Sequence, residues 1–145
     1  MVGSVKKDER LVRFIEAEAG TSSKACWIRL EYAARDPLVV SVSLCAQSRA
    51  TVIEREVMRT DLRDALQRRI YDVDLVMTPD VLRGHTLLRF REPHVAVTVV
   101  ASARKIADFI RESDQLIPFG TGEVDALNTA FEDLLVSERV PNPRS

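Results

Sequence analysis

Several stretches of this sequence alternate apolar and polar residues at a period of two, and this pattern restricts the fold more than any other feature. Residues 25–32 show it most clearly. Their apolar even-numbered side chains would share one side of an extended strand, and Trp27, Arg29 and Glu31 would share the other. Because successive side chains of a strand point to opposite faces, the pattern predicts a sheet with one face on the core and one face toward solvent.

The alternating runs fall into two groups, each followed by helical periodicity. Strands are predicted over residues 10–17, 25–32, 38–46 and 51–57, followed by a helix over 61–69 with Thr60 as its N-cap. Three more strands are predicted over 72–77, 86–91 and 94–101, followed by helices over 103–112, capped by Ser102, and over 125–136. In the first of these three strands, Val73, Leu75 and Met77 are expected to face the core. Short turns between the strands indicate antiparallel meanders, so the expected fold class is α+β: an antiparallel, β-rich single domain of order ββββ-α-βββ-α-α.

The chain is long enough for one self-sufficient core. It has 145 residues, within the usual range of a single domain, and a domain of this size buries roughly 68–70% of its unfolded surface. We expect one domain over residues 10–137, with a flexible N-terminus over 1–9 and a flexible, proline-containing tail over 138–145.

Charge and hydropathy point to a protein of the cytoplasm. The net charge is −1, so the basic excess that is typical of nucleic-acid-binding proteins is absent from the chain as a whole. Its apolar runs are far shorter than the ~20 residues that cross a bilayer, and no signal peptide is apparent, so no membrane insertion is expected. Cys26 and Cys45 lack metal-ligand spacing and are interpreted as core thiols.

No residue pattern in the sequence is typical of an enzyme. His85 and His94 stand at the edges of predicted strands without an evident partner, and Asp72 with Asp74 is interpreted as the solvated side of a strand. The glycines at 120 and 122 lack the lysine of a phosphate-binding loop. We therefore predict no catalytic residues, no cofactor and no metal.

Four residues are candidates for contacts with other macromolecules: Trp27, Arg29, Arg59 and Arg63. Tryptophan and arginine are enriched at the energetic centres of protein interfaces, and a tryptophan can also stack on an unpaired base. The alternatives are a Trp27 covered by a helix of the same chain and arginines that simply solvate the central helix.

The order of motifs from Tyr32 onward resembles the SsgA-like family of sporulation and cell-division proteins of filamentous actinobacteria. Tyr32 precedes Asp36-Pro37, and Glu54, Arg59, Leu62 and Leu66 fit the family's strand-to-helix segment. The strand over 74–79 and the closing segments 109–113, 118–123 and 125–127 follow at the family's spacing. Arg55 stands where members often have a tryptophan, which marks a divergent member.

The resemblance implies a non-enzymatic regulator of sporulation-specific cell division. It implies a whirly-like fold of the single-strand-binding type, assembled as a homo-oligomer, with a trimer suspected. It also implies contacts with FtsZ or with other family members, and a cytoplasmic location concentrated at division septa. Single-stranded nucleic-acid binding is the alternative, supported by the implied fold and by Trp27 with Arg29, Arg89 and Arg91 on outward strand faces.

Overall fold

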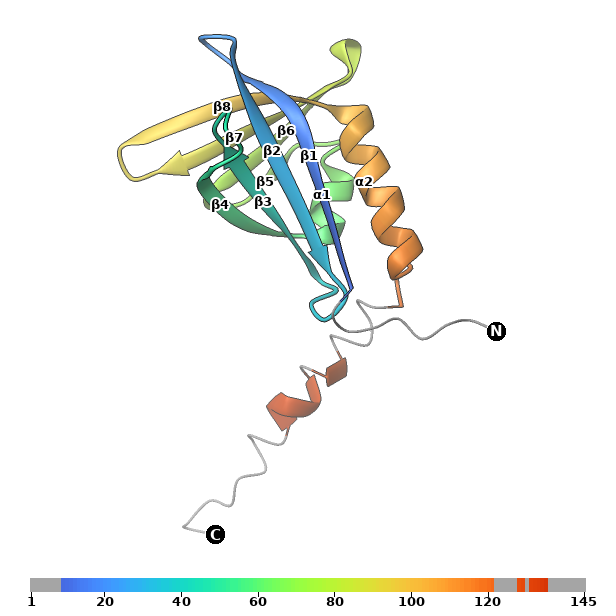
Figure 1. Ribbon diagram of the computed structural model, residues 1–145. Helices are drawn as coiled ribbons and strands as arrows, with labels where there is room; N and C mark the ends of the chain where they lie inside the picture. The colour runs from blue at the N-terminus through green and yellow to red at the C-terminus, as the bar shows by residue number, and fades with distance from the viewer. Residues whose placement is uncertain (1–8, 122–127, 130, 136–145) are drawn as a thin grey trace, which may run out of the picture.

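Eight strands form one antiparallel sheet that curls around two helices (Figure 1). The computed structural model describes residues 9–121, 128–129 and 131–135. The strand order is β4-β3-β2-β1-β8-β7-β6-β5. The strands are β1 (Arg10–Ala19), β2 (Lys24–Ala33), β3 (Val39–Cys45), β4 (Thr51–Met58), β5 (Ile70–Tyr71), β6 (Leu75–Asp80), β7 (His85–Glu92) and β8 (Val95–Ser102). The helices are α1 (Arg59–Asp64), the 3-10 turn η1 (Val81–Arg83) and α2 (Ala103–Leu116). The predicted α+β class with antiparallel meanders is confirmed.

The sheet consists of two four-stranded meanders that meet at β1 and β8. Only three residue pairs join them, from Ala17 with Ala101 to Ala19 with Val99. The Gly20 N–H also donates a hydrogen bond to the Thr98 carbonyl at 2.7 Å. A side chain at Gly20 would place its Cβ 3.2 Å from that same oxygen, a tight approach that favours a glycine at the junction.

The inward faces of both meanders pack on the helices in one shared core. α2 contributes the predicted apolar stripe, with Ile106, Phe109 and Ile110 all buried. The predicted N-cap of α2 is confirmed, because the Ser102 hydroxyl accepts a hydrogen bond from the Lys105 N–H at 3.3 Å. Both helices therefore lie on the core side of the sheet and leave its other side, the outer face, uncovered by either helix.

The helix predicted over 61–69 is shorter than expected. It spans Arg59–Asp64 and follows an extended Met58 with no side-chain cap, so Thr60 lies inside the helix and is not its N-cap. Residues beyond Asp64 continue in turns until Ile70, which is buried in the core and pairs with Met77 as part of β5. The burial of Ile70 and its pairing with Met77 outweigh the helical pattern of the preceding residues. The prediction of a helix was therefore wrong beyond Asp64.

The strand predicted over 72–77 is displaced toward the C-terminus. β6 begins at Leu75, and Val73 is 82% exposed instead of facing the core. Asp72 and Asp74 therefore precede the strand and do not share a strand face. The strand also continues past its predicted end at Met77 and through Pro79. A proline is tolerated there because β5 covers only Val76 and Met77, so that side of β6 is an open edge.

The last predicted helix is described only in part. Residues 128–129 and 131–135 are helical, whereas Asp125 and Leu127 lie outside the described residues. Phe131, Leu134 and Leu135 are exposed. The predicted flexible segments 1–9 and 138–145 also lie outside the described residues, apart from Glu9.

Candidate protein-interaction surface

Trp27 lies on the outer face of the sheet, as the alternation of its strand predicts. Its indole N–H donates a hydrogen bond to the Gln47 carbonyl at 3.2 Å. Its ring meets Phe14 of β1 edge to face, with ring centroids 6.4 Å apart and an interplanar angle of 89°. These contacts hold a half-buried Trp27 in one orientation and leave part of its ring exposed on the outer face.

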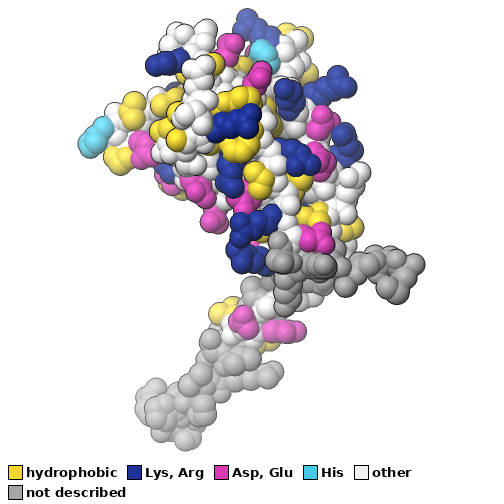
Figure 2. Space-filling model, in the orientation of Figure 1, with side chains coloured by type: hydrophobic (Ala, Val, Ile, Leu, Met, Phe, Trp, Pro, Cys, Tyr) yellow, Lys and Arg dark blue, Asp and Glu magenta, His cyan; other side chains and the backbone are white. Residues whose placement is uncertain are grey.

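Arg49 completes this site from the turn between β3 and β4. Its φ of 74° turns the backbone sharply, and its guanidinium lies 4.3 Å from the Trp27 ring and 4.9 Å from the Phe14 ring. Arg49 is exposed and forms no ion pair with any carboxylate among the described residues. We call Phe14, Trp27 and Arg49 the aromatic–arginine cluster. A hydrophobic patch crossed by a basic side chain is visible on the face of β1 and β2 turned toward the viewer in Figure 2.

Sequence reasoning missed two members of this cluster. The alternation of β1 is enough to place Phe14 on the outer face, but Arg49 falls in a turn whose conformation the pattern does not give. The meeting of the three side chains depends on the register that places Glu16 opposite Trp27 and Phe14 opposite Arg29.

Arg29 shares the outer face with Trp27, but its charge is already compensated. Its guanidinium pairs with Glu31 at 2.5 Å, and Glu31 also pairs with Arg10 at 3.3 Å. The side chain of Arg29 is 27% exposed. Arg29 therefore borders the cluster as one part of a three-residue ion-pair network.

Carboxylates on the same face of the sheet form an acidic rim on the side of the aromatic–arginine cluster that Glu16 occupies. Glu16 lies directly across from Trp27, and Glu18, Glu54 and Glu56 are exposed on the same face of the sheet. This rim favours a partner with a basic border and disfavours the phosphate backbone of a nucleic acid.

Arg59 is buried, at odds with its predicted role as a contact residue. It has no exposed surface, and its guanidinium donates hydrogen bonds to the carbonyls of Ser113 at 3.1 Å and Ile117 at 2.7 Å. It also stacks between Tyr32 and Phe119, at 4.7 and 3.9 Å from the ring centroids. Arg59 thus binds carbonyls at the C-terminal end of α2, where cations are favourable, and offers no surface to a partner.

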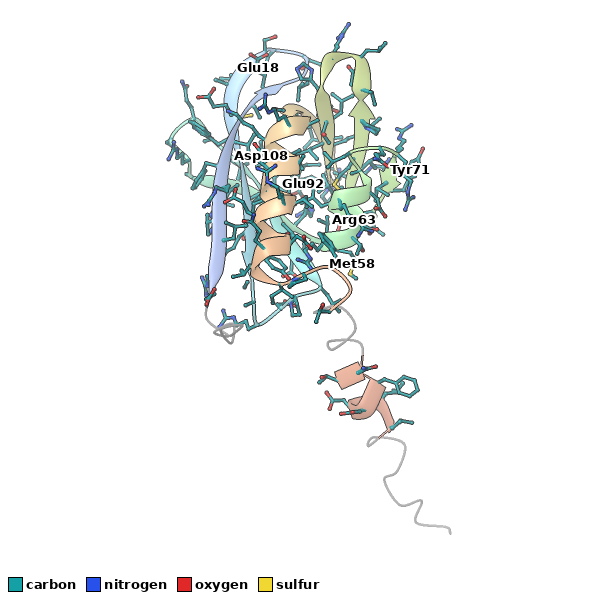
Figure 3. All side chains as sticks on the ribbon, turned by 90° about the vertical axis from the view of Figure 1, so that its right-hand side faces the viewer. Glu18, Met58, Arg63, Tyr71, Glu92 and Asp108 are labelled. Atoms are coloured by element: carbon teal, nitrogen blue, oxygen red, sulfur yellow. The ribbon has the colours of Figure 1, made fainter. Side chains whose placement is uncertain are left out.

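Arg63 projects from α1 beside the C-terminal part of α2 (Figure 3). Its side chain is 44% exposed, pairs with Asp64 at 3.0 Å and lies 4.8 Å from the Phe119 ring. The structure therefore separates the four predicted contact residues: Trp27 and Arg29 lie on the outer face, whereas Arg59 and Arg63 lie beside the helices.

The described residues contain no group of three or more metal-ligating side chains. His85 borders an open hollow of about 660 Å³ together with Glu16, Cys26 and Lys105, which is not an arrangement of nucleophile, base and orienting group.

Cys26 and Cys45 are free thiols, and burial raises the pKa of the Cys26 thiol above its usual value. In the part of the chain that the structure describes, no helix has the length and apolar character to span a bilayer.

Two comparisons with known proteins identify similar sequences and folds. Residues 27–122, more than half of the chain, match the family described as "Streptomyces sporulation and cell division protein, SsgA". The fold is similar to SsgB of Streptomyces coelicolor, with a TM-score of 0.72 and 22% identity over 83% of this chain and 98% of that one. It is also similar to an SsgA-like sporulation-specific cell division protein of Thermobifida fusca, with a TM-score of 0.71 and 15% identity over 87% and 98% of the two chains.

No individually curated protein matches the sequence. The match to the family nevertheless extends from the strand that carries Trp27 through the turn that follows α2, and the shared fold covers both meanders. This protein belongs to the SsgA-like family of sporulation and cell-division proteins.

Proposed function

We propose that this protein is a non-enzymatic adaptor of sporulation-specific cell division that acts through protein–protein contacts in the cytoplasm. In this role it helps to select septum sites, by recruiting FtsZ or by acting on septal wall synthesis, and it works as a homo-oligomer concentrated at septa. Membership of the SsgA-like family supports the process. The aromatic–arginine cluster is the observation that carries the proposed mode of action.

The cluster has the properties of an energetic centre in a protein interface. Trp27 and Phe14 offer apolar surface in a fixed geometry, and the Arg49 guanidinium stacked on them has no carboxylate partner among the described residues. Rigid aromatic residues and arginine dominate binding energy at such centres because little side-chain entropy is lost when a partner binds. The surrounding glutamates would select a partner whose rim is basic.

Single-stranded nucleic acid is the weaker candidate for the same surface. Stacking of a base on Trp27 would bring its phosphates close to Glu16 and the other carboxylates of the rim. A titration with fluorescent oligonucleotides at low salt tests this directly. Tight binding that Trp27→Ala abolishes would replace the adaptor proposal.

Binding of purified FtsZ tests the adaptor role. We expect Arg49→Glu and Trp27→Ala each to weaken binding about tenfold or more, which corresponds to about 1.4 kcal/mol. Arg104→Glu is the matched control, because Arg104 is an exposed arginine of α2 that is not part of the cluster. Equal affinities for all three variants would rule out the cluster as the binding surface.

Septation in sporulating filaments tests the biological role. A deletion strain should place or time its sporulation septa abnormally, and the Arg104→Glu gene should restore the normal pattern while Arg49→Glu should not. Normal septation in the deletion strain would contradict the proposal.

A further inference from the structure

An open hollow of about 660 Å³ lies where the two meanders meet. Ala17 of β1 pairs with Ala101 of β8 across this junction, and both residues border the hollow. The part of β1 that precedes Ala17 has no partner in β8, because β8 ends at Ser102 and the chain continues as α2. The hollow therefore opens where β1 loses its neighbouring strand. Its volume lies within the range of about 300–1,000 Å³ that is usual for small-molecule sites.

Small and apolar side chains make room for a ligand at this junction. Ala17 and Ala101 are both buried, and Val100 adds a third aliphatic side chain to the lining. Trp27 also borders the hollow, and the hydrogen bond from its indole N–H to the Gln47 carbonyl fixes the ring there. The hollow thus offers a ligand short aliphatic side chains and one aromatic ring.

Acidic and basic side chains border the hollow from different elements. Glu16 and Glu18 border it from β1, and they point to the same side of the sheet because they are two residues apart on one strand. Lys105 borders it from the first turn of α2, and His85 borders it from the start of β7, where it pairs with Ser102. The acidic groups therefore lie on the β1 side of the junction, and the basic groups lie beyond it.

These charged groups are not compensated within the part of the chain that the structure describes. Neither glutamate forms an ion pair with a described residue, and neither do Lys105 and His85. An ammonium group can donate three hydrogen bonds and therefore suits the paired carboxylates of Glu16 and Glu18. A carboxylate group can accept hydrogen bonds from the Lys105 ammonium and the His85 imidazole. A ligand with one charge alone would face a like charge on one side of the hollow, so a ligand that carries both charges fits best.

We propose that the hollow is a binding site for a zwitterionic amino acid or short peptide with free ends. The ammonium group of this ligand binds Glu16 and Glu18, and its carboxylate binds Lys105 and His85. The aliphatic side chains of the hollow and the Trp27 ring contact the part of the ligand between its two ends. This site goes beyond the proposed adaptor function and does not depend on it.

Fluorescence of Trp27 tests the site, because this residue borders the hollow and is the only tryptophan of the chain. The probes are alanine, dialanine, trialanine and tetraalanine with free ends, and the same four compounds with an acetylated amino group or an amidated carboxyl group. We expect saturable binding of at least one free probe. Blocking either end of that probe should weaken its binding at least tenfold, because one side of the hollow then loses its partner. Isothermal titration calorimetry measures the same affinities independently.

Two double variants assign the two ends of the ligand. Glu16→Gln with Glu18→Gln removes the acidic side of the hollow, and Lys105→Met with His85→Leu removes the basic side. In the first double variant, acetylation of the probe should no longer change its affinity, whereas amidation should still weaken binding. The second double variant should show the reverse, and a general distortion of the hollow would not produce this selectivity. If a double variant binds no probe, Glu18→Gln and Lys105→Met alone provide the same comparison.

Glu54→Gln with Glu56→Gln is the matched control, because these exposed glutamates of β4 do not border the hollow, and it should keep the affinity of the unmodified protein. Absence of saturable binding for all four free probes would overturn the proposal. Equal affinities for free and blocked probes would overturn it as well, because they would show apolar contact alone. Binding that both double variants leave unchanged would place the ligand outside the hollow. None of these results changes the test of FtsZ binding, which depends on the aromatic–arginine cluster.

Discussion

At the scale of single residues, burial decides what an arginine does. Arg49 and Arg59 both stack on two aromatic rings, yet one guanidinium is exposed and the other has no exposed surface. Arg59 follows the edge strand β4 directly, and the carbonyls at the end of α2 surround its head group. The same chemical group therefore stabilises the fold at one position and is available to a partner at the other.

Replacement of Arg59 should destabilise the protein without altering its outer surface. Arg59→Met leaves the Ile117 carbonyl and the end of α2 without a buried donor, so we expect the free energy of unfolding to fall by about 2–3 kcal/mol. Arg63→Met, at an exposed ion pair, should change it by less than about 1 kcal/mol. Urea denaturation followed by circular dichroism measures both. Equal losses would mean that the buried hydrogen bonds of Arg59 contribute little.

The Cys26 thiol should react slowly with alkylating agents. Because burial raises its pKa, the reactive thiolate forms only at a higher pH than in an unfolded chain. A raised pKa means that the folded protein holds this proton more tightly. The contribution of this thiol to the free energy of unfolding is therefore fully present below the pKa of the unfolded thiol. It is lost as the pH rises through the pKa of the folded thiol. The pH profile of iodoacetamide labelling, compared with that in urea, checks the shift. Coincident profiles would disprove it.

At the scale of elements, local capping and tertiary pairing compete to set the boundaries. α2 has the serine cap and apolar stripe that its sequence predicts, and it begins where expected. α1 has a favourable helical pattern beyond Asp64, but the chain leaves the helix so that Ile70 can enter the core. Local signals therefore define an element only where the core does not require a different conformation.

The cap of α2 provides a test of this local contribution. Ser102→Ala removes the acceptor for the Lys105 N–H and should lower the free energy of unfolding by about 1 kcal/mol. Ser102→Asp should retain most of the stabilisation that the cap provides, because an aspartate side chain also accepts this hydrogen bond and its negative charge is favourable at a helix N-terminus. Thermal or urea denaturation of the two variants provides the comparison. A larger loss for aspartate than for alanine would show that the surroundings of the half-buried Ser102 matter more than the cap.

At the scale of the whole molecule, a narrow junction unites two similar halves. Only three residue pairs connect β1 to β8, but both meanders contribute to the same hydrophobic core. Arg55 of β4 adds a contact across the curl, donating hydrogen bonds to the Arg91 carbonyl at 2.9 Å and to Glu92 at 3.0 Å. Because they share one core, the two meanders should unfold cooperatively.

We expect one unfolding transition for the whole protein. The single tryptophan, Trp27, reports on the first meander, whereas far-ultraviolet circular dichroism reports on all the strands. The two signals should give the same midpoint in urea, as for a two-state domain. A tryptophan transition that precedes the circular-dichroism transition would show that the meanders unfold separately.

The sequence by itself determined the strands of the first meander, the fold class, the serine cap of α2 and the outward position of Trp27. These features depend on periodicity and on short-range hydrogen bonds, both of which are determined by residues close together in the sequence. Only the tertiary structure decided that Arg59 is buried, that β5 replaces the end of the central helix, and that Phe14, Trp27 and Arg49 meet. Each of these depends on strand register or on competition for the core, and such long-range terms are not encoded in the pattern of any one segment.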